Sequence, residues 1–140
     1  MSGEGEFPVN SLRVCINRRK EDSEVEGFLC SIALKDILHF TGKIEFVLKV
    51  DEAYDRIGRP QPQEVLRSFQ ENSRPLYNSY NGNPVQWHTS EEIRKYSGSE
   101  VTYDLVMLSR KHAEWQGILK DAAGEIKGKF DSVLGCLKML

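Results

Sequence analysis

The feature of this sequence that most constrains its fold is an internal repeat. Residues 24–50 align without a gap with residues 114–140, and five of the 27 aligned positions are identical. Unrelated segments of that length would share roughly one or two identities. The identical pairs are Glu24/Glu114, Gly27/Gly117, Leu29/Leu119, Ala33/Ala123 and Phe40/Phe130. We therefore expect the first and last thirds of the chain to adopt the same local structure.

Each copy of the repeat predicts three strands followed by a helix. Segments in which apolar and polar residues alternate between turn residues favour strands. A longer segment with apolar residues three or four positions apart favours a helix. The predicted strands are 11–19, 24–32 and 36–40 in the first copy and 103–111, 114–121 and 125–130 in the second, with helices over 43–57 and from 131 or 132 to 140.

The predicted fold class is α+β, with two β-β-β-α repeats forming a pseudo-symmetric antiparallel sheet, or two small sheets, and helices on one face. A single unit has too small a core to be stable alone, which favours two fused copies. The predicted division is a flexible N-terminus (1–10) and a single domain (11–140), made of repeat one (11–58), an irregular connecting segment (59–100) and repeat two (101–140). Within the connecting segment, the capping-box pattern from Thr89 to Glu92 predicts a short helix.

The first predicted helix has one apolar stripe that we expect to be buried. Ile44, Val47, Leu48 and Tyr54 lie on this stripe. Thr41 precedes the helix and is expected to cap its beginning, because a threonine hydroxyl accepts hydrogen bonds from the first free N–H groups of a helix.

The two hairpins predict which residues share a face of the sheet. If Cys15 pairs with Phe28 in the first hairpin, the alignment pairs Met107 with Ile118 in the second. We expect the opposite face to form the core under both helices, from Val14, Ile16, Val25, Leu29, Val106, Leu108, Trp115 and Leu119. The first face carries the candidate interface: Cys15, Phe28, Cys30, Met107 and Ile118. It is too apolar for a solvent face, so the middle segment, a second subunit or closure of the sheet is expected to cover it.

Charge and hydropathy limit the functional classes. The chain has 140 residues and a formal net charge of −2, whereas proteins that coat nucleic acids are usually strongly basic. No apolar run reaches the roughly 18–20 residues of a bilayer span. The acidic, Gly-rich start lacks the basic and apolar regions of a signal peptide. We therefore expect a cytoplasmic protein with no membrane partner.

Motifs for catalysis, metals and cofactors are missing. The sequence has no Gly-rich phosphate loop, HExxH motif or nucleophile elbow. Cys15, Cys30 and Cys136 lack the spacing of metal ligands. Asp51 falls on the apolar stripe of the first helix, where it is expected either to reach water or to bond the 59–68 segment. We predict no catalytic, metal-binding or cofactor-binding residue; an enzyme of an unrecognised class is the alternative.

The two hairpin tips carry basic residues that could contact phosphate groups: Arg18, Arg19 and Lys20 in the first, and Arg110 and Lys111 in the second. A nucleic-acid-binding regulator is therefore a second hypothesis. Acidic neighbours such as Glu21, Asp22 and Glu114 neutralise part of this charge. The leading hypothesis is a non-catalytic interaction or adaptor module that binds a protein partner or a second copy of itself.

Several short motifs, taken in order, carry a resemblance to a known family. They are Val14-Cys15-Ile16-Asn17, Lys49-Val50-Asp51, Pro60-Gln61 followed by Arg67-Ser68-Phe69, Trp115-Gln116-Gly117 and Phe130-Asp131-Ser132. Together they resemble a family of small uncharacterised proteins from anaerobic Gram-positive bacteria. The resemblance covers most of the chain. It implies a shared fold and a cytosolic bacterial origin, and it brings no activity and no binding residues.

Overall fold

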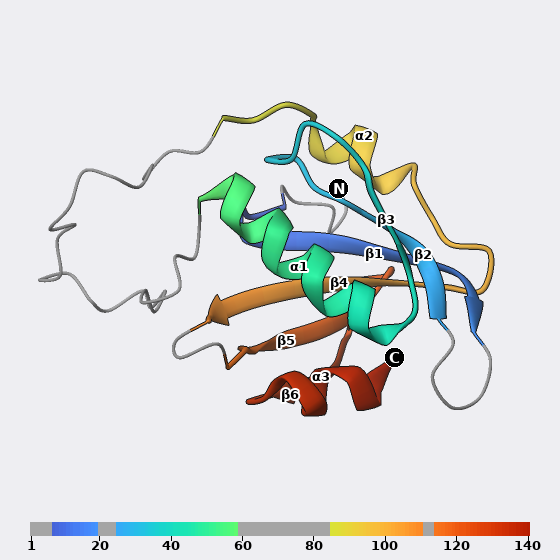
Figure 1. The fold of residues 1–140 in the computed structure, drawn as a ribbon. Coiled ribbons are helices and arrows are strands. Elements are labelled where there is room, and N and C mark those ends of the chain that lie inside the picture. The colour runs from blue at the N-terminus through green and yellow to red at the C-terminus, as the bar shows by residue number, and fades with distance from the viewer. Residues whose placement is uncertain (1–6, 20–24, 59–84, 111–113) are drawn as a thin grey trace, which may run out of the picture.

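The computed structural model describes residues 7–19, 25–58, 85–110 and 114–140. Its centre is one six-stranded antiparallel sheet with the strand order β3-β2-β1-β4-β5-β6 (Figure 1). The strands are β1 (Ser11–Arg19), β2 (Val25–Cys30), β3 (Leu38–Thr41), β4 (Val101–Ser109), β5 (Gln116–Asp121) and β6 (Ile126–Phe130). The helices are α1 (Lys43–Ile57), α2 (Ser90–Arg94) and α3 (Val133–Met139). The α+β class is confirmed.

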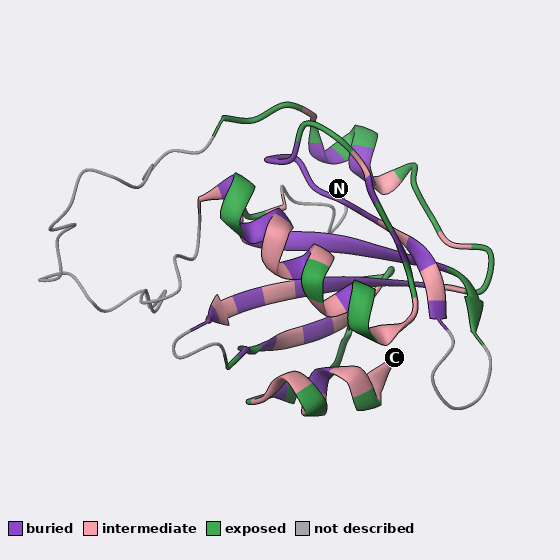
Figure 2. Cartoon of the chain, in the orientation of Figure 1, coloured by how far each residue is buried: buried purple, intermediate pink, exposed green. Residues whose placement is uncertain are grey.

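The two longest strands lie at the centre of the sheet. β1 and β4 have nine residues each and pair with each other, with Arg13 opposite Asp104. Each also forms a hairpin with the next strand along the chain, so β2 and β5 flank the centre and β3 and β6 form the edges. The first hairpin has the predicted register, with Cys15 opposite Phe28. Figure 2 shows β1 buried over most of its length.

The register of the second hairpin corrects the prediction by one residue. Met107 pairs with Gly117, and Val106 pairs with Ile118. Leu105 and Met107 are therefore fully buried in the core, whereas Val106 is only half-buried on the opposite face. A strand slipped by one residue turns every side chain to the other face. Met107 is thus a core residue and cannot belong to the interface predicted for it.

The buried stripe of α1 also differs from the predicted one. It consists of Phe46, Val50, Ala53, Tyr54 and Ile57. Ile44 and Leu48 point outward and are 79% and 60% exposed. Gly42, with φ at 92°, is the N-cap residue instead of Thr41, and no side chain caps the helix. Within the core, the Tyr54 hydroxyl donates to the backbone oxygen atoms of Asn10 and Leu105.

The helices lie on both faces of the sheet. On one face, the ring of Phe46 in α1 contacts the rings of Phe40 and Trp115, and α3 places Met139 next to Gly128. The expectation of helices on one face holds for α1 and α3. The short helix α2 belongs to the connecting segment and lies on the opposite face, where Arg13 hydrogen-bonds the backbone at its end.

Two glycines sit where the sheet has no room for a side chain. A Cβ atom on Gly27 would lie 1.9 Å from the Cys15 oxygen, and one on Gly117 would lie 2.3 Å from the Val106 oxygen. We expect Gly117→Ala to lower the free energy of unfolding by about 3 kcal/mol or more, because backbone must move to relieve the clash. Urea denaturation measures this.

Gly128→Ala is the matched control for that measurement. Its Cβ would meet only the flexible end of Met139, at 3.0 Å, so the loss should stay below about 1 kcal/mol. If both variants lose the same free energy of unfolding, the backbone contact at Gly117 is not what excludes a side chain there.

Candidate functional site

A buried ion pair lies at the middle of the sheet face opposite α1. The Arg13 Nε and Nη2 atoms donate to the two carboxylate oxygens of Asp104 at 2.9 and 3.0 Å. Both residues are 4% exposed. Burial raises the pKa of the Asp104 carboxyl, and the Arg13 guanidinium acts against that rise. A bidentate pair of this kind fixes both side chains in one orientation.

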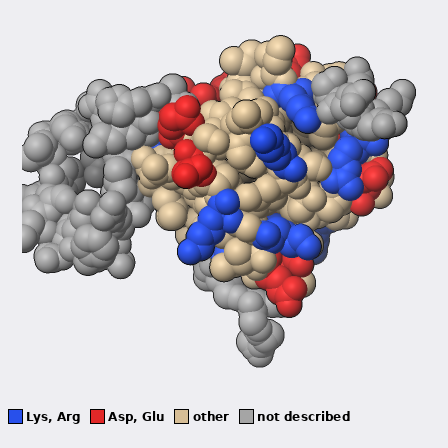
Figure 3. Space-filling view, turned by 90° about the horizontal axis from the view of Figure 1, so that it is seen from below, with Lys and Arg blue, Asp and Glu red and all other residues tan. Residues whose placement is uncertain are grey.

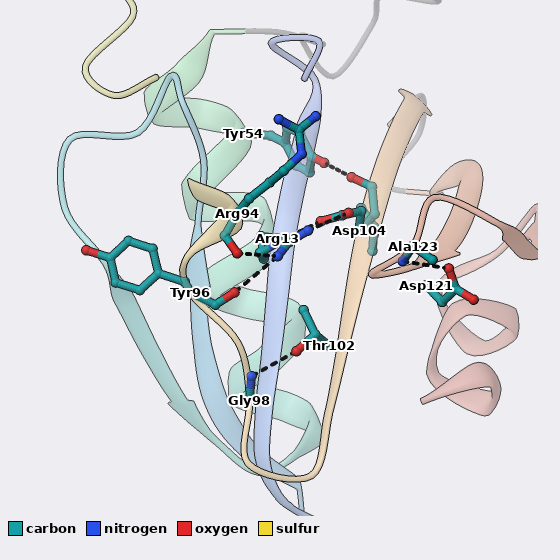
Figure 4. A network of polar contacts seen from close by, with 10 residues as sticks. Arg13, Tyr54, Arg94, Tyr96, Gly98, Thr102, Asp104, Asp121 and Ala123 are labelled. Atoms are coloured by element: carbon teal, nitrogen blue, oxygen red, sulfur yellow. Dashed lines mark hydrogen bonds and ion pairs between the residues drawn. The ribbon is translucent and has the colours of Figure 1, made fainter. Parts of the chain in front are cut away.

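The same guanidinium holds the chain that crosses this face. Arg13 Nη1 donates to the backbone oxygens of Arg94 and Tyr96 at 3.4 and 3.1 Å, at the end of α2 (Figure 4). The Phe7 N–H donates to the Ser90 hydroxyl at the start of α2, which Thr89 caps through the predicted capping box. Residues 7 and 90–96 therefore lie over the β1–β2 half of the face.

Apolar contacts complete this cover. Ile93 of α2 is 2% exposed. The Tyr96 ring meets the edge of Phe28, which also contacts the His39 ring. Of the three covers considered for this face, the middle segment is the one that occupies the β1–β2 half.

Two thiols lie beneath the cover. Cys15 and Cys30 are buried on neighbouring strands. A hydrogen bond between the two thiols lowers the pKa of Cys15, with a smaller contribution from the Arg13 charge, and raises that of Cys30. Because Cys15 is 0% exposed, a substrate cannot reach its sulfur without opening the fold. The third cysteine, Cys136, lies in the core, where burial raises its pKa to about 12.

The other half of this face, over β4, β5 and β6, is different in character. Val106, Ile118 and Lys129 form one row across it, and Lys120 and Ile126 form the next. Val106 and Ile118 are half-buried and lie outside the core cluster, and Ile126 is 57% exposed. Of the described helices, α1 and α3 lie on the other face and α2 lies over the β1–β2 half, so none of them covers these rows. We call these five residues the open half-face.

The predicted interface residues are divided among three environments. Cys15, Phe28 and Cys30 lie under the α2 segment, Met107 lies in the core, and only Ile118 belongs to the open half-face. The prediction placed Val106 in the core because its β4 register was wrong by one residue, and it did not include Lys120, Ile126 or Lys129.

The predicted phosphate contacts do not form one basic surface. Arg18 is exposed. Arg19 donates to the Leu140 backbone oxygen at 2.6 Å and lies 3.9 Å from a Glu100 carboxylate oxygen. Lys20 and Lys111 lie outside the described residues. Viewed from the β6 and α3 side, Lys and Arg side chains form separate groups with neutral surface between them (Figure 3).

Arg110 corrects the prediction of a second basic tip. It is 4% exposed, and its guanidinium pairs with Asp51 at 3.1 Å and Asp55 at 3.0 Å. The Trp115 indole N–H also donates to Asp51. Asp51 is thus held at the edge of the α1 stripe by Arg110 and Trp115, and Arg110 joins α1 to the residue that follows β4.

The described part of the chain was also compared with the requirements of a metal site, a histidine site and a membrane span. No group of three His, Cys, Asp or Glu side chains there is placed to hold a metal ion. His39 stacks obliquely on Phe28, and the His88 ring lies 3.2 Å from the Lys35 backbone oxygen. None of the described helices has the length and apolar character of a membrane span.

Comparison with known proteins gives no match to any family model, curated protein or solved structure. The resemblance to a family from anaerobic Gram-positive bacteria therefore stays a prediction.

The buried ion pair makes stability depend on pH in a testable way. Arg13→Met should lower the free energy of unfolding by about 3–5 kcal/mol at about pH 7, because it leaves a buried carboxylate without its cation. The pKa of Asp104, already raised, then rises further. The loss is present above that folded-state pKa and shrinks as the pH falls through it, since protonated Asp104 needs no cation.

Urea denaturation at about pH 7 and about pH 5 measures this difference. Arg19→Met, which removes an exposed ion pair, is the control and should cost less than about 1 kcal/mol at either pH. A loss for Arg13→Met that does not change with pH would contradict the assigned role of Asp104.

Proposed function

We propose that this protein is a non-catalytic interaction module that binds a partner protein through the open half-face. The observation that carries this proposal is that a helix of the chain covers one half of a continuous sheet face and not the other half. Its β1–β2 half lies under α2, whereas its β4–β6 half presents Ile126, which is 57% exposed, and the half-buried Ile118 and Val106, without a described helix over them. Exposed aliphatic side chains rimmed by charges are typical of protein interaction sites.

We further propose that the two halves are copies of one β-β-β-α unit. In β2 and β3, Gly27 pairs with Phe40; in β5 and β6, Gly117 pairs with Phe130. These are the glycines and phenylalanines that are identical in the sequence alignment. The strand order is also symmetric about the centre: the first, second and third strands of each unit, β1-β2-β3 and β4-β5-β6, follow one another from the centre to the edge.

Irregularities in the strands support the same relation. β1 bulges after Ile16 and β4 bulges after Met107, and these two residues are the partners of Gly27 and Gly117. Bulges break the ladder at particular residues and are specific features of a fold. Under a two-fold relation between the units, the covered and open halves of the sheet face are equivalent positions.

The competing functions have less support. Arg110 is engaged by two aspartates, so the basic tips lose one of the cations that a phosphate-binding role requires. A cysteine nucleophile would need access to solvent, and all three cysteines are buried. Three free cysteines favour a reducing compartment, and we place the protein in the cytoplasm on that ground.

The proposal predicts where binding partners will map. When peptides displayed as a random library are selected on the full chain, the binders should shift the amide resonances of β4, β5 and β6. Ile126→Ser should weaken them at least tenfold, which corresponds to about 1.4 kcal/mol. Titration with isotope-labelled protein measures both effects.

Leu134→Ser is the matched control. Leu134 lies on α3, on the helical face, and is 60% exposed, close to the exposure of Ile126; its replacement should leave binding unchanged. Binders that map to the α1 and α3 surface, or a selection that yields none, would refute the proposal. Self-association through the same face would appear as a concentration-dependent mass that Ile126→Ser abolishes.

A further inference from the structure

We infer that the occupant of the open half-face is a short amphipathic helix of a partner protein, with acidic side chains beside an aliphatic anchor. This inference rests on the proposed function and names the partner's chemistry. It comes from two independent observations: the way the chain covers the equivalent half of its own sheet, and the charges that distinguish the open half from the covered one.

The covered half shows what this sheet face accepts. A helix of five residues, α2, lies there with one aliphatic anchor, Ile93, buried to 2%. Just after it, the Tyr96 ring rests against Phe28. Arg13 bonds the backbone oxygens that end this segment. One helical turn with a buried branched side chain, together with Phe7 and Tyr96, therefore covers this half, and polar contacts fix its ends.

The open half presents a comparable row. Across β1, β2 and β3, the row on the α2 side consists of Cys15, which is buried, Phe28, which is half-buried, and His39, which is exposed, paired in that order. Across β4, β5 and β6, the corresponding row is Val106, Ile118 and Lys129. In both rows, the two inner strands contribute apolar side chains and the edge strand contributes a His or Lys side chain. The aliphatic pair offers a flat surface for an apolar anchor from a helix.

Charge separates the two halves. In the central row, Cys30 lies next to Arg13 on one side, and Lys120 lies next to Asp104 on the other. Lys129 occupies the edge position that His39 has in the covered half. Asp104 is already neutralised by Arg13, so the open half-face carries a positive charge that no described carboxylate matches at Lys129. Acidic side chains on the partner would complement it.

The partner's acidity also follows from what surrounds these lysines. The residues next to them, Ile118 and Ile126, are aliphatic. Sites for nucleic-acid strands instead have aromatic side chains that stack on bases and rows of basic side chains along the phosphate backbone. A protein helix can satisfy both features at once, because residues three and four apart share one face. Its aliphatic stripe would meet Ile118 and Ile126, and its carboxylates would reach Lys120 and Lys129.

The test uses the full chain and three stapled helical peptides of about 14 residues. The first has an aliphatic stripe flanked by Glu, the second has Lys in place of each Glu, and the third has Ser in place of each aliphatic residue. Fluorescence anisotropy gives the affinities, and resonance shifts give the site. The acidic amphipathic peptide should bind at β4–β6, at least tenfold more tightly than the other two, and should weaken as salt rises.

Charge reversal on the protein completes the test. Lys129→Glu should weaken the acidic peptide at least tenfold and improve the Lys peptide. Lys138→Glu is the matched control: it is exposed, lies on α3 and changes the net charge equally, and it should have no effect. Circular dichroism establishes that both variants fold.

The outcomes separate this inference from the proposed function. Equal binding of the Glu and Lys peptides, binding of the acidic peptide elsewhere, or a single-stranded RNA that displaces it and binds more tightly would overturn the inference. If library-selected binders of another chemistry still map to the open half-face, the proposed function stands alone. If no binder of any chemistry maps there, both fail.

Discussion

The ion pair between Arg13 and Asp104 is the contact on which the arrangement of this sheet depends. It joins the two central strands on the face opposite α1, and both side chains are removed from water. A buried pair adds little net stability compared with apolar residues of the same size, but breaking it is costly. Its value here is specificity: a slip of β1 against β4 by one residue would separate the two charges and leave each of them buried alone.

Arg13 links the register of β1 and β4 to the position of α2 over the sheet. Two of its nitrogens are taken by Asp104, and the third reaches the backbone that ends the α2 segment. The group that fixes the strand pairing thus also fixes a helix over β1 and β2. A carboxylate in the equivalent position on β4 has no N–H to offer to a helix end. The chain therefore provides a side-chain donor for the end of a covering helix on one half of the face only.

The sequence predicted the elements well and their facing residues less well, for a physical reason. Glycines, turns and alternation marked the strands and α1, whose bounds were predicted as observed. Residues 105–108 are all apolar, so they carry no period-two signal and the register of β4 was open to a one-residue error. The first turns of α1 are similarly apolar on several sides. The partners of Arg110, Asp51 and Asp55, are distant in sequence, and no local pattern could reveal them. A charged residue inside each central strand, at 13 and at 104, was the one available signal of the ion pair.

If the two halves are copies of one unit, as proposed, the difference between their surfaces would give the second copy a separate role in binding. Two copies of one unit solve the problem of a small core, because each central strand covers the edge of the other. Once the copies are fused, their equivalent surfaces can diverge independently. One half has Cys15 and Cys30 beneath a segment of the chain itself, and the other has Lys120 and Lys129 around aliphatic residues. The charge of Lys120, which is half-buried beside Asp104, acts against the rise in the pKa of that carboxyl, so this lysine also has a role within the sheet. Under the proposed function, a partner would bring the opposite charge to Lys129 and an apolar side chain to the aliphatic residues beside it.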